Sequence, residues 1–247
     1  MHSKTLKLTA AVMALTALLA SCQQKEDPKP DYDYQIDMDQ YETAITVKDQ
    51  TYLILANKQT PLGSYYAPES LSTVPTELTL YGKDVKLEST TALAAEALVR
   101  ELRACGYTDI AVTSGYRSYQ YQQSLFNTYL DQEMAAHPNW TREQCEAQVG
   151  TYSARPGQSE HQTGLCLDLI SEKNVVLDET FAQNPAYAWL IENAHCFGFI
   201  LRYPADKTAV TGYSYEPWHY RFVGVEAATE IHEQGITLEE YLEKLKD

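Results

Sequence analysis

SEHQTGLCLDL, residues 159–169, combines an apolar run with a histidine and an aspartate. From Leu165 to Ile170 the chain is almost entirely apolar, which predicts a buried β-strand that begins after a turn at Gly164. Asp168 lies inside this run, and a buried carboxylate must be paired, hydrogen-bonded or bound to a metal ion. His161 precedes the turn and can approach the same point if the loop folds back along the strand.

A second polar cluster lies in EPWH, residues 216–219. Pro217 disfavours a helix interior, so an extended or turned segment can bring Glu216 and His219 to one pocket. Together with His161 and Asp168 this makes two histidines and one aspartate, a ligand set that leaves one position on zinc for water. Zinc lowers the pKa of such a water molecule, and Glu216 is then available to accept its proton.

The residues alone leave a simpler interpretation open. A histidine near an aspartate is usually a structural hydrogen bond, and a histidine next to a tryptophan is often a packing contact. The sequence also does not prove zinc over another divalent ion, although two histidines and one carboxylate favour it.

Several other enzyme classes are excluded by missing motifs. The chain contains no HExxH, SxxK, GxSxG, P-loop or GxGxxG sequence, so the corresponding zinc-protease, serine-enzyme and nucleotide-binding sites are absent. Its 247 residues carry a formal net charge of −15. This charge argues against a general nucleic-acid binder, because phosphate backbones attract basic surfaces.

The N-terminal residues predict export. Two lysines precede a mostly apolar run from Leu8 to Ala20, which is too short for a confident membrane span and indicates a signal peptide over residues 1–21. LASC, residues 19–22, resembles a bacterial lipobox, in which Cys22 is acylated and becomes the new N-terminus. We therefore expect an exported bacterial lipoprotein anchored to a cell-envelope membrane; the alternative is a plain secreted signal.

Residues 22–40 are polar, include two prolines and lack apolar periodicity, so we predict a flexible tether. An ordered edge segment is the alternative. The remaining residues, 41–247, are expected to form one domain that contains the candidate metal site, since 44% of the chain is hydrophobic and this is enough for one core. Export permits disulfides, but the sequence does not choose between free thiols and any pairing of Cys105, Cys145, Cys166 and Cys196.

Short strands and helices are interspersed without regular βαβ alternation, which favours the α+β class. Strands are expected within residues 51–62, 109–114, 165–170, 199–204 and 220–223, and helices within residues 90–105, 118–136, 141–149, 184–197, 225–235 and 237–246. In the first of these helices we expect Thr90 or Thr91 to be the cap, and Leu93 to belong to the buried stripe.

Several motifs together resemble the VanY-type D-alanyl-D-alanine carboxypeptidases, zinc metallopeptidases of the bacterial cell wall. They are SGYRSYQYQ (114–122), SEHQTGLCLDL (159–169), GFILRYP (198–204) and EPWHYRFVG (216–224), with LILANKQTPLGSYYAPESL (53–71) similar to the family's lead-in segment. The similarity extends over most of the chain, from about residue 52 to residue 223. One departure is Cys166, where the family often has a small apolar residue.

The resemblance implies the α+β fold of the hedgehog and D,D-peptidase group, with a central antiparallel sheet and surrounding helices. It implies one Zn²⁺ ion bound by His161, Asp168 and His219, with Glu216 as catalytic base. Arg117 matches the arginine that faces the substrate and could stabilise the oxyanion. Further positions that match the peptide pocket of related enzymes are Gln122, Ser159 and Tyr203. Simpler roles for these side chains are a salt bridge for Arg117, a turn cap for Ser159 and core packing for Tyr203.

The implied reaction is hydrolysis of the C-terminal D-Ala peptide bond of peptidoglycan stem peptides, by a metal-activated water. Two alternatives remain. Related enzymes cut the L,D bond of tetrapeptide stems or release a dipeptide, and the same motifs serve all three. A non-catalytic wall-binding lipoprotein is the other alternative, although such a protein is expected to have lost Glu216 or a zinc ligand. Oligomeric state and physiological role stay open.

Overall fold

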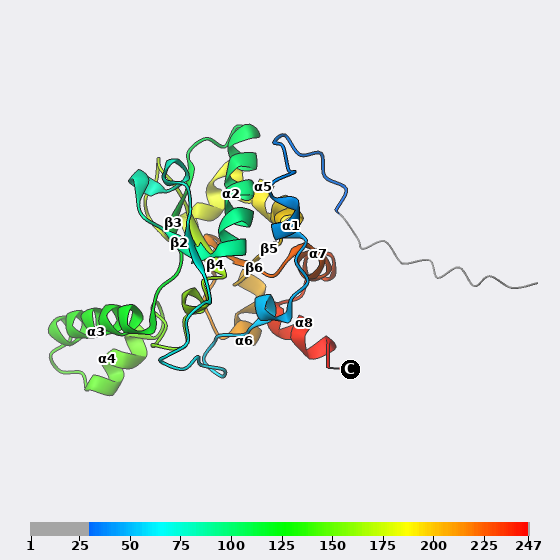
Figure 1. Ribbon diagram of the computed structural model, residues 1–247. Coiled ribbons are helices and arrows are strands. Elements are labelled where there is room, and N and C mark those ends of the chain that lie inside the picture. Colours follow the sequence, from blue (N-terminus) through cyan, green and yellow to red (C-terminus); the bar gives the residue numbers. More distant parts are fainter. Residues whose placement is uncertain (1–29, 247) are drawn as a thin grey trace, which may run out of the picture.

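The computed structural model describes residues 30–246, and its centre is a four-stranded antiparallel sheet of order β3-β4-β6-β5 (Figure 1). The strands are β3 (Ile110–Ser114), β4 (Cys166–Ser171), β6 (His219–Phe222) and β5 (Phe199–Leu201). A separate two-stranded ribbon is formed by β1 (Leu71–Thr73) and β2 (Lys86–Glu88). The predicted α+β class and central antiparallel sheet are confirmed.

Side chains of β4 alternate between two different environments, as the period of a strand requires. Leu167 and Leu169 are fully buried in the main hydrophobic core. Cys166 and Asp168 point to the opposite face, which is also buried but polar. Their partners across β6 are Arg221 and His219, respectively. One face of the sheet therefore packs into the hydrophobic core, and the other face carries charged side chains and side chains of the kinds that bind metal ions.

Helix α2 (Ser89–Ala104) covers the apolar face, and its Ala94, Leu98 and Leu102 are fully buried. Two details of the sequence prediction are wrong here. Glu88 is the cap, because its carboxylate accepts hydrogen bonds from the backbone N–H groups of residues 90 and 91. Leu93 is 44% exposed, because the buried stripe is centred one residue further along the helix.

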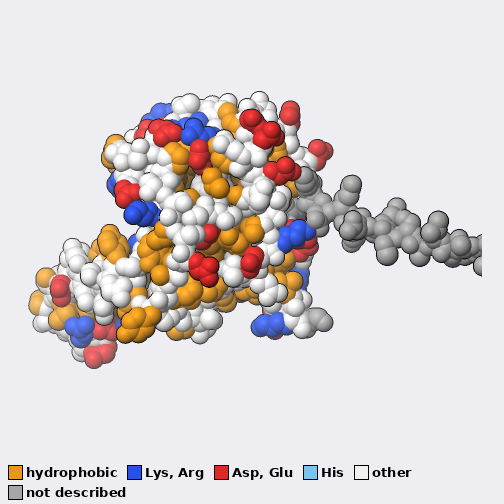
Figure 2. All heavy atoms as spheres, viewed as in Figure 1, with side chains coloured by type: hydrophobic (Ala, Val, Ile, Leu, Met, Phe, Trp, Pro, Cys, Tyr) orange, Lys and Arg blue, Asp and Glu red, His pale blue; other side chains and the backbone are white. Residues whose placement is uncertain are grey.

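Helices α3 (Tyr119–Ala136) and α4 (Arg142–Val149) form a projection that stands away from the sheet (Figures 1 and 2). Their boundaries follow from the sequence, since the side chains of Ser118 and Thr141 accept hydrogen bonds at the two N-termini. The projection has a small core of its own, made by Phe126, Leu130, Cys145 and Val149.

The remaining helices pack around the sheet. They are α1 (Glu42–Ile45), α5 (Pro185–Asn193), α6 (Thr208–Thr211), α7 (Val225–Gln234) and α8 (Leu238–Lys244). Helices α7 and α8 share a second apolar cluster with Ile200 of β5. No helix between residues 30 and 246 has both the length and the apolar character needed to cross a membrane.

The strand expected within residues 51–62 is wrong. Residues Gln50–Leu53 form a 3-10 helix, and the chain continues without regular structure. The backbone of this apolar run is bonded to a side chain and not to a neighbouring strand. Arg221 donates hydrogen bonds to the carbonyl oxygens of Tyr52 and Ile54, both at 2.8 Å.

The tether predicted for residues 22–40 is wrong for its described part, from residue 30 onward. Tyr32, Tyr34 and Ile36 pack against the main core. The backbone N–H groups of Gln35 and Ile36 donate to the carboxylate of Glu101, which is fully buried on α2. The ordered edge segment is therefore the right alternative for these residues. The predicted signal peptide, Cys22 and the first part of the tether lie outside the described residues.

All four cysteines of the described part are free thiols. Cys145, Cys166 and Cys196 are buried, and Cys105 is partly buried beside Glu101 and Tyr32. The question that the sequence left open is therefore answered in favour of free thiols in this structure.

We expect Gly115→Ala to destabilise the protein by about 1–3 kcal/mol, because a side chain here overpacks a filled site. A Cβ atom at residue 115 would lie 2.5 Å from the carbonyl oxygen of Lys86 and 2.8 Å from Val85. Gly63→Ala is the matched control, since a Cβ there meets nothing within 4 Å. Urea unfolding checks the difference; equal stability of the two variants would contradict the packing described.

Candidate metal centre and catalytic cleft

A cleft with a volume of about 1090 Å³ opens between the polar face of the sheet, the α3–α4 projection and the segment that contains α6. It brings together every candidate site residue that the sequence predicts within the described part. These lining residues are Arg117, Gln122, Ser159, His161, Asp168, Tyr203, Glu216 and His219. Segments more than a hundred residues apart in the chain therefore meet in one site.

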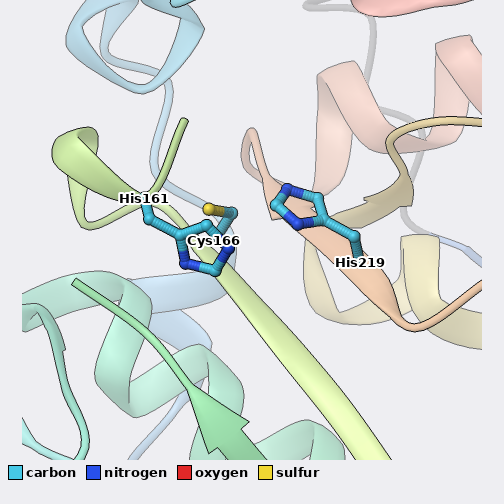
Figure 3. A group of neighbouring side chains, drawn as sticks. All are labelled: His161, Cys166 and His219. Atoms are coloured by element: carbon cyan, nitrogen blue, oxygen red, sulfur yellow. The ribbon is translucent and has the colours of Figure 1, made fainter. Parts of the chain in front are cut away.

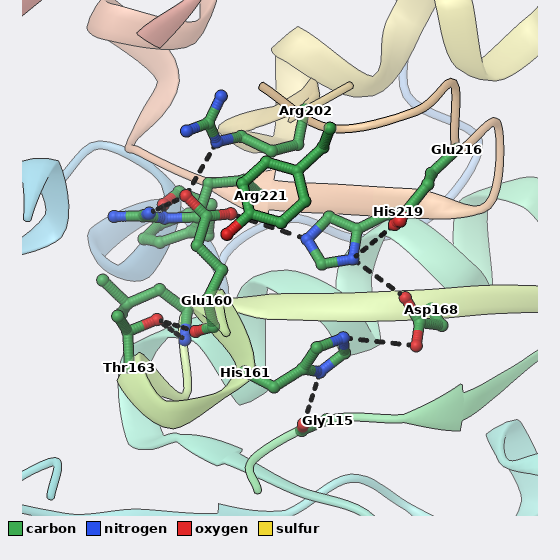
Figure 4. A network of polar contacts seen from close by, with 12 residues as sticks. Gly115, Glu160, His161, Thr163, Asp168, Arg202, Glu216, His219 and Arg221 are labelled. Carbon is green, nitrogen blue, oxygen red and sulfur yellow. Dashed lines mark hydrogen bonds and ion pairs between the residues drawn. The ribbon is translucent and has the colours of Figure 1, made fainter. Parts of the chain in front are cut away.

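Asp168 and His219 are direct partners across β4 and β6. The antiparallel register places both side chains on the same face of the sheet. His219 Nδ1 lies 3.0 Å from Asp168 Oδ1, and both residues are at most 5% exposed. The sheet itself, rather than a flexible loop, fixes this half of the site (Figure 4).

His161 reaches the same carboxylate from the other side. It belongs to a 3-10 helix, Glu160–Thr163, that ends at Gly164 in the left-handed conformation, so the chain turns directly into β4. His161 Nε2 lies 3.3 Å from Asp168 Oδ2. Its Nδ1 lies 2.7 Å from the carbonyl oxygen of Gly115. Because a carbonyl only accepts, Nδ1 carries a proton and Nε2 of the neutral ring directs its lone pair at the site.

The three side chains form a buried site suited to a cation. Burial by itself would raise the pKa of Asp168, but His161 and His219 hold it well below its usual range. Burial and Arg117 oppose protonation of His161, yet Cys166 and Asp168 raise its pKa to about 9. Both pKa shifts arise because negatively charged groups lie close to the two imidazole rings. A divalent metal ion can provide the positive charge there in place of protons on the rings.

Cys166 is the other possible ligand near the two rings (Figure 3). Its sulfur and the ring nitrogens of His161 and His219 lie within 4.8 Å of one another. Asp168 contacts both rings directly, at 3.0 and 3.3 Å, near the separation of about 3.3 Å between nitrogen or oxygen ligands around tetrahedral zinc. The geometry therefore favours Asp168 as the third ligand, with Cys166 beside the site.

Glu216 lies next to this ligand set at the wall of the cleft. Its Oε2 is 3.7 Å from His219 Nδ1, and its side chain is 26% exposed. Its removal from solvent raises the pKa of this carboxyl group, against the opposing influence of His219. A carboxyl group with a raised pKa, close to a metal site and still open to the cleft, is suited to accept and return a proton.

Arg117 follows β3 and is held in place by its backbone N–H, which donates to the carbonyl oxygen of His161. Its guanidinium forms no ion pair within residues 30–246, and its Nε has no hydrogen-bond partner there. The simpler expectation of a structural salt bridge is therefore not met. A partly buried guanidinium that has no ion-pair partner within residues 30–246 provides a fixed positive charge in the cleft wall, beside the metal site.

The three further candidates for the peptide pocket, Gln122, Ser159 and Tyr203, have different local contacts. Gln122 is buried and donates to the carbonyl oxygen of Ala154 at 2.7 Å, which leaves its own oxygen without a partner in this part of the chain. Ser159 precedes the 3-10 helix, but its side chain makes no cap hydrogen bond. Tyr203 packs its ring 5.0 Å from that of His219, so it is at once a packing residue and part of the cleft wall.

The sequence interpretation missed Glu160, which is completely buried behind the metal site. Its Oε1 accepts hydrogen bonds from Arg202 and Arg221, both at 2.7 Å (Figure 4). Burial would raise the pKa of Glu160, but the two guanidinium groups hold it well below its usual range. A signal was present, since Arg221 lies within β6 and Arg202 directly follows β5, and a buried arginine in an apolar segment requires a buried partner.

We expect Asp168→Ala to lose its zinc and Cys166→Ala to keep one zinc ion per chain. The carboxylate oxygens lie 3.0 and 3.3 Å from ring nitrogens of His219 and His161, which is close to the separation expected between two ligands of one zinc ion. Metal analysis after dialysis checks both variants against the unchanged protein. The opposite pattern, with zinc lost only from Cys166→Ala, would assign the third ligand to the cysteine.

Comparison with known proteins places this site in a family. Residues 84–225 match the family model described as VanY: D-alanyl-D-alanine carboxypeptidase. A D-alanyl-D-alanine carboxypeptidase of Enterococcus faecalis is 40% identical over 192 residues, which cover 77% of this chain and 65% of that protein.

Two solved structures are similar along most of the chain. The LdcB LD-carboxypeptidase is 35% identical with a TM-score of 0.68, and the match covers 81% of this chain and 89% of that one. A mutant of the vancomycin resistance D,D-pentapeptidase VanY, in complex with Zn(II), is 38% identical with a TM-score of 0.64, over 78% of this chain and 99% of that one. These matches confirm the predicted fold group, and the second confirms zinc in a relative.

The donor set of this chain fits that ion. Two neutral imidazoles and one carboxylate are ligands that zinc prefers, and His161, Asp168 and His219 would hold it at the wall of the cleft. Glu216 lies beside these three residues, where a catalytic base would be placed. Fold, motif order and donor set agree, and the chain belongs to the VanY family of D-alanyl-D-alanine carboxypeptidases.

Proposed function

We propose that the protein is a zinc-dependent carboxypeptidase that hydrolyses the C-terminal D-Ala peptide bond of peptidoglycan stem peptides. The observation that carries the proposal is the meeting of His161, Asp168, His219 and Glu216 in one cleft. Support for the substrate comes from the relatives, which are carboxypeptidases acting on D-alanyl peptides. A wall-binding protein without activity has no need for Glu216 beside an intact ligand set.

When bound, zinc supplies a Lewis acid that polarises a carbonyl group and lowers the pKa of water. The residues of the chain do the rest. Glu216 accepts the proton of the attacking water and returns it to the leaving amine. Arg117 stabilises the negative charge that develops on the carbonyl oxygen, because its charge is fixed in the wall of the cleft before the reaction starts.

The second candidate is cleavage of the L,D bond of a tetrapeptide stem. It is supported by the similarity to the LdcB LD-carboxypeptidase, whose TM-score is as high as that of the D,D-pentapeptidase. Both reactions use the same metal chemistry, and the choice between them depends on how the cleft accepts the residue before the scissile bond.

The test uses the purified full chain with stem pentapeptide and tetrapeptide, each with and without a chelator, and reads the products by mass. The proposal expects loss of one D-Ala from the pentapeptide, abolished by the chelator and restored by zinc. Cleavage of the tetrapeptide alone would select the L,D reaction. A zinc-loaded protein that cuts neither peptide would contradict the carboxypeptidase proposal.

We expect Glu216→Gln to keep its zinc and to lose turnover by about 10²- to 10⁴-fold, the usual contribution of a general acid–base group. Glu179→Gln is the matched control, since Glu179 lines the same cleft but is exposed and is not a predicted site residue. Zinc content and kcat are measured for both variants. Normal turnover of Glu216→Gln would remove this carboxylate from the mechanism.

We also propose that the protein is an exported lipoprotein held at a cell-envelope membrane through Cys22, close to the peptides of the wall. Support comes from the lipobox-like sequence alone, in which Cys22 ends the apolar run. Cys22→Ala is expected to move the protein from the membrane fraction to the soluble fraction of bacterial cells, whereas Cys105→Ala stays with the membrane. Membrane association of the Cys22→Ala protein would contradict the anchor.

A further inference from the structure

The strongest feature that the proposed reaction does not use is Glu160, the buried carboxylate behind His219. Its side chain is completely inaccessible, as are those of Arg202 and Arg221. The residue belongs to the same 3-10 helix as His161. It therefore connects the metal site to a charged network within the fold.

The two oxygens of Glu160 have different surroundings. Oε1 accepts from Arg202 Nε and Arg221 Nη1, each at 2.7 Å. Oε2 accepts from neither arginine and lies 3.5 Å from His219 Nε2 (Figure 4). Within residues 30–246, both Oε2 and Nε2 are buried atoms without a hydrogen-bond partner, and they face one another.

The other nitrogen of His219 faces the metal site. Nδ1 lies 3.0 Å from Asp168 and 3.7 Å from Glu216. A neutral imidazole that binds a metal ion through Nδ1 must carry its proton on Nε2. A carboxylate oxygen directed at Nε2 stabilises that tautomer, and partners of this kind increase metal affinity.

We propose that Glu160 is a positioning residue that holds His219 in the tautomer able to bind the metal ion through Nδ1. The inference rests on the proposed metal site and adds a residue outside the ligand set. It also gives a role to the network around the carboxylate. The arginines occupy Oε1 and thereby direct Oε2 at the ring.

The network is anchored on both sides. Arg202 donates to both carboxylate oxygens of Glu239 on α8, at 2.6 and 2.8 Å. Arg221 donates to backbone carbonyl groups of the 52–54 segment. Glu239 thus supports Arg202 and forms no ion pair with His219, so a variant at Glu239 separates a structural effect from a positioning effect.

The test compares Glu160→Gln with Glu239→Gln by zinc affinity, in competition with a chelator, and by urea unfolding. In Glu160→Gln the amide keeps its oxygen towards the arginines and turns its NH₂ group to His219, so two donors face one another. The opposite orientation would place NH₂ against two guanidinium groups. We expect Glu160→Gln to bind zinc about 10- to 100-fold more weakly, and Glu239→Gln to keep the original affinity even if it is less stable.

A second measurement needs no variant. In the zinc-loaded protein, the two-bond ¹H–¹⁵N correlation of His219 is expected to show the proton on Nε2 and the metal on Nδ1. Zinc on Nε2 would overturn the proposal, as would equal zinc affinities of the two variants. An unchanged protein that binds no zinc would instead contradict the proposed function, so the two failures are distinguishable.

Discussion

The carboxylate of Asp168, held between two imidazole rings, is the interaction on which the rest of the site depends. A buried carboxylate without partners is strongly destabilising, and the fold supplies two partners from different directions. His219 comes from the neighbouring strand in register, and His161 from the 3-10 helix that leads into β4. The three side chains are positioned by backbone structure, so the site is largely formed before a metal ion or substrate arrives.

Because side chains alternate along each strand, one face of the sheet forms the hydrophobic core and the other face forms the polar site. Leu167, Leu169 and Tyr220 pack into the core on one face, while residues 166, 168, 219 and 221 lie on the other. The polar face remains buried because its charges are paired within it. Arg221 shows how far this pairing extends, since it joins Glu160 to the backbone of the N-terminal segment. Metal site and fold are thus stabilised by one continuous set of contacts.

Much of this arrangement follows from local sequence. The apolar run around Asp168 predicts β4, the helical patterns of residues 118–136 and 141–149 predict α3 and α4, and the motifs identify the residues that meet in the cleft. Each of these signals is contained within a few consecutive residues and does not depend on distant parts of the chain.

What could not be predicted depends on partners that are distant in the chain. The apolar start of segment 51–62 has the composition of a strand, but the carbonyl oxygens of Tyr52 and Ile54 accept hydrogen bonds from Arg221 and not from a neighbouring strand. Local sequence predicts a tether for the tyrosines of residues 32–34, because the core that they cover is formed by residues far along the sequence. Glu160 was overlooked for the same reason, since each of its arginine partners lies in a different motif.

X-ray absorption at the zinc edge of the loaded protein distinguishes Asp168 from Cys166 as the third ligand. We expect one zinc ion with nitrogen and oxygen ligands only, at about 2.0–2.2 Å. This result would assign the third protein ligand to Asp168. A sulfur ligand at about 2.3 Å would overturn that assignment, because it would place Cys166 on the metal ion.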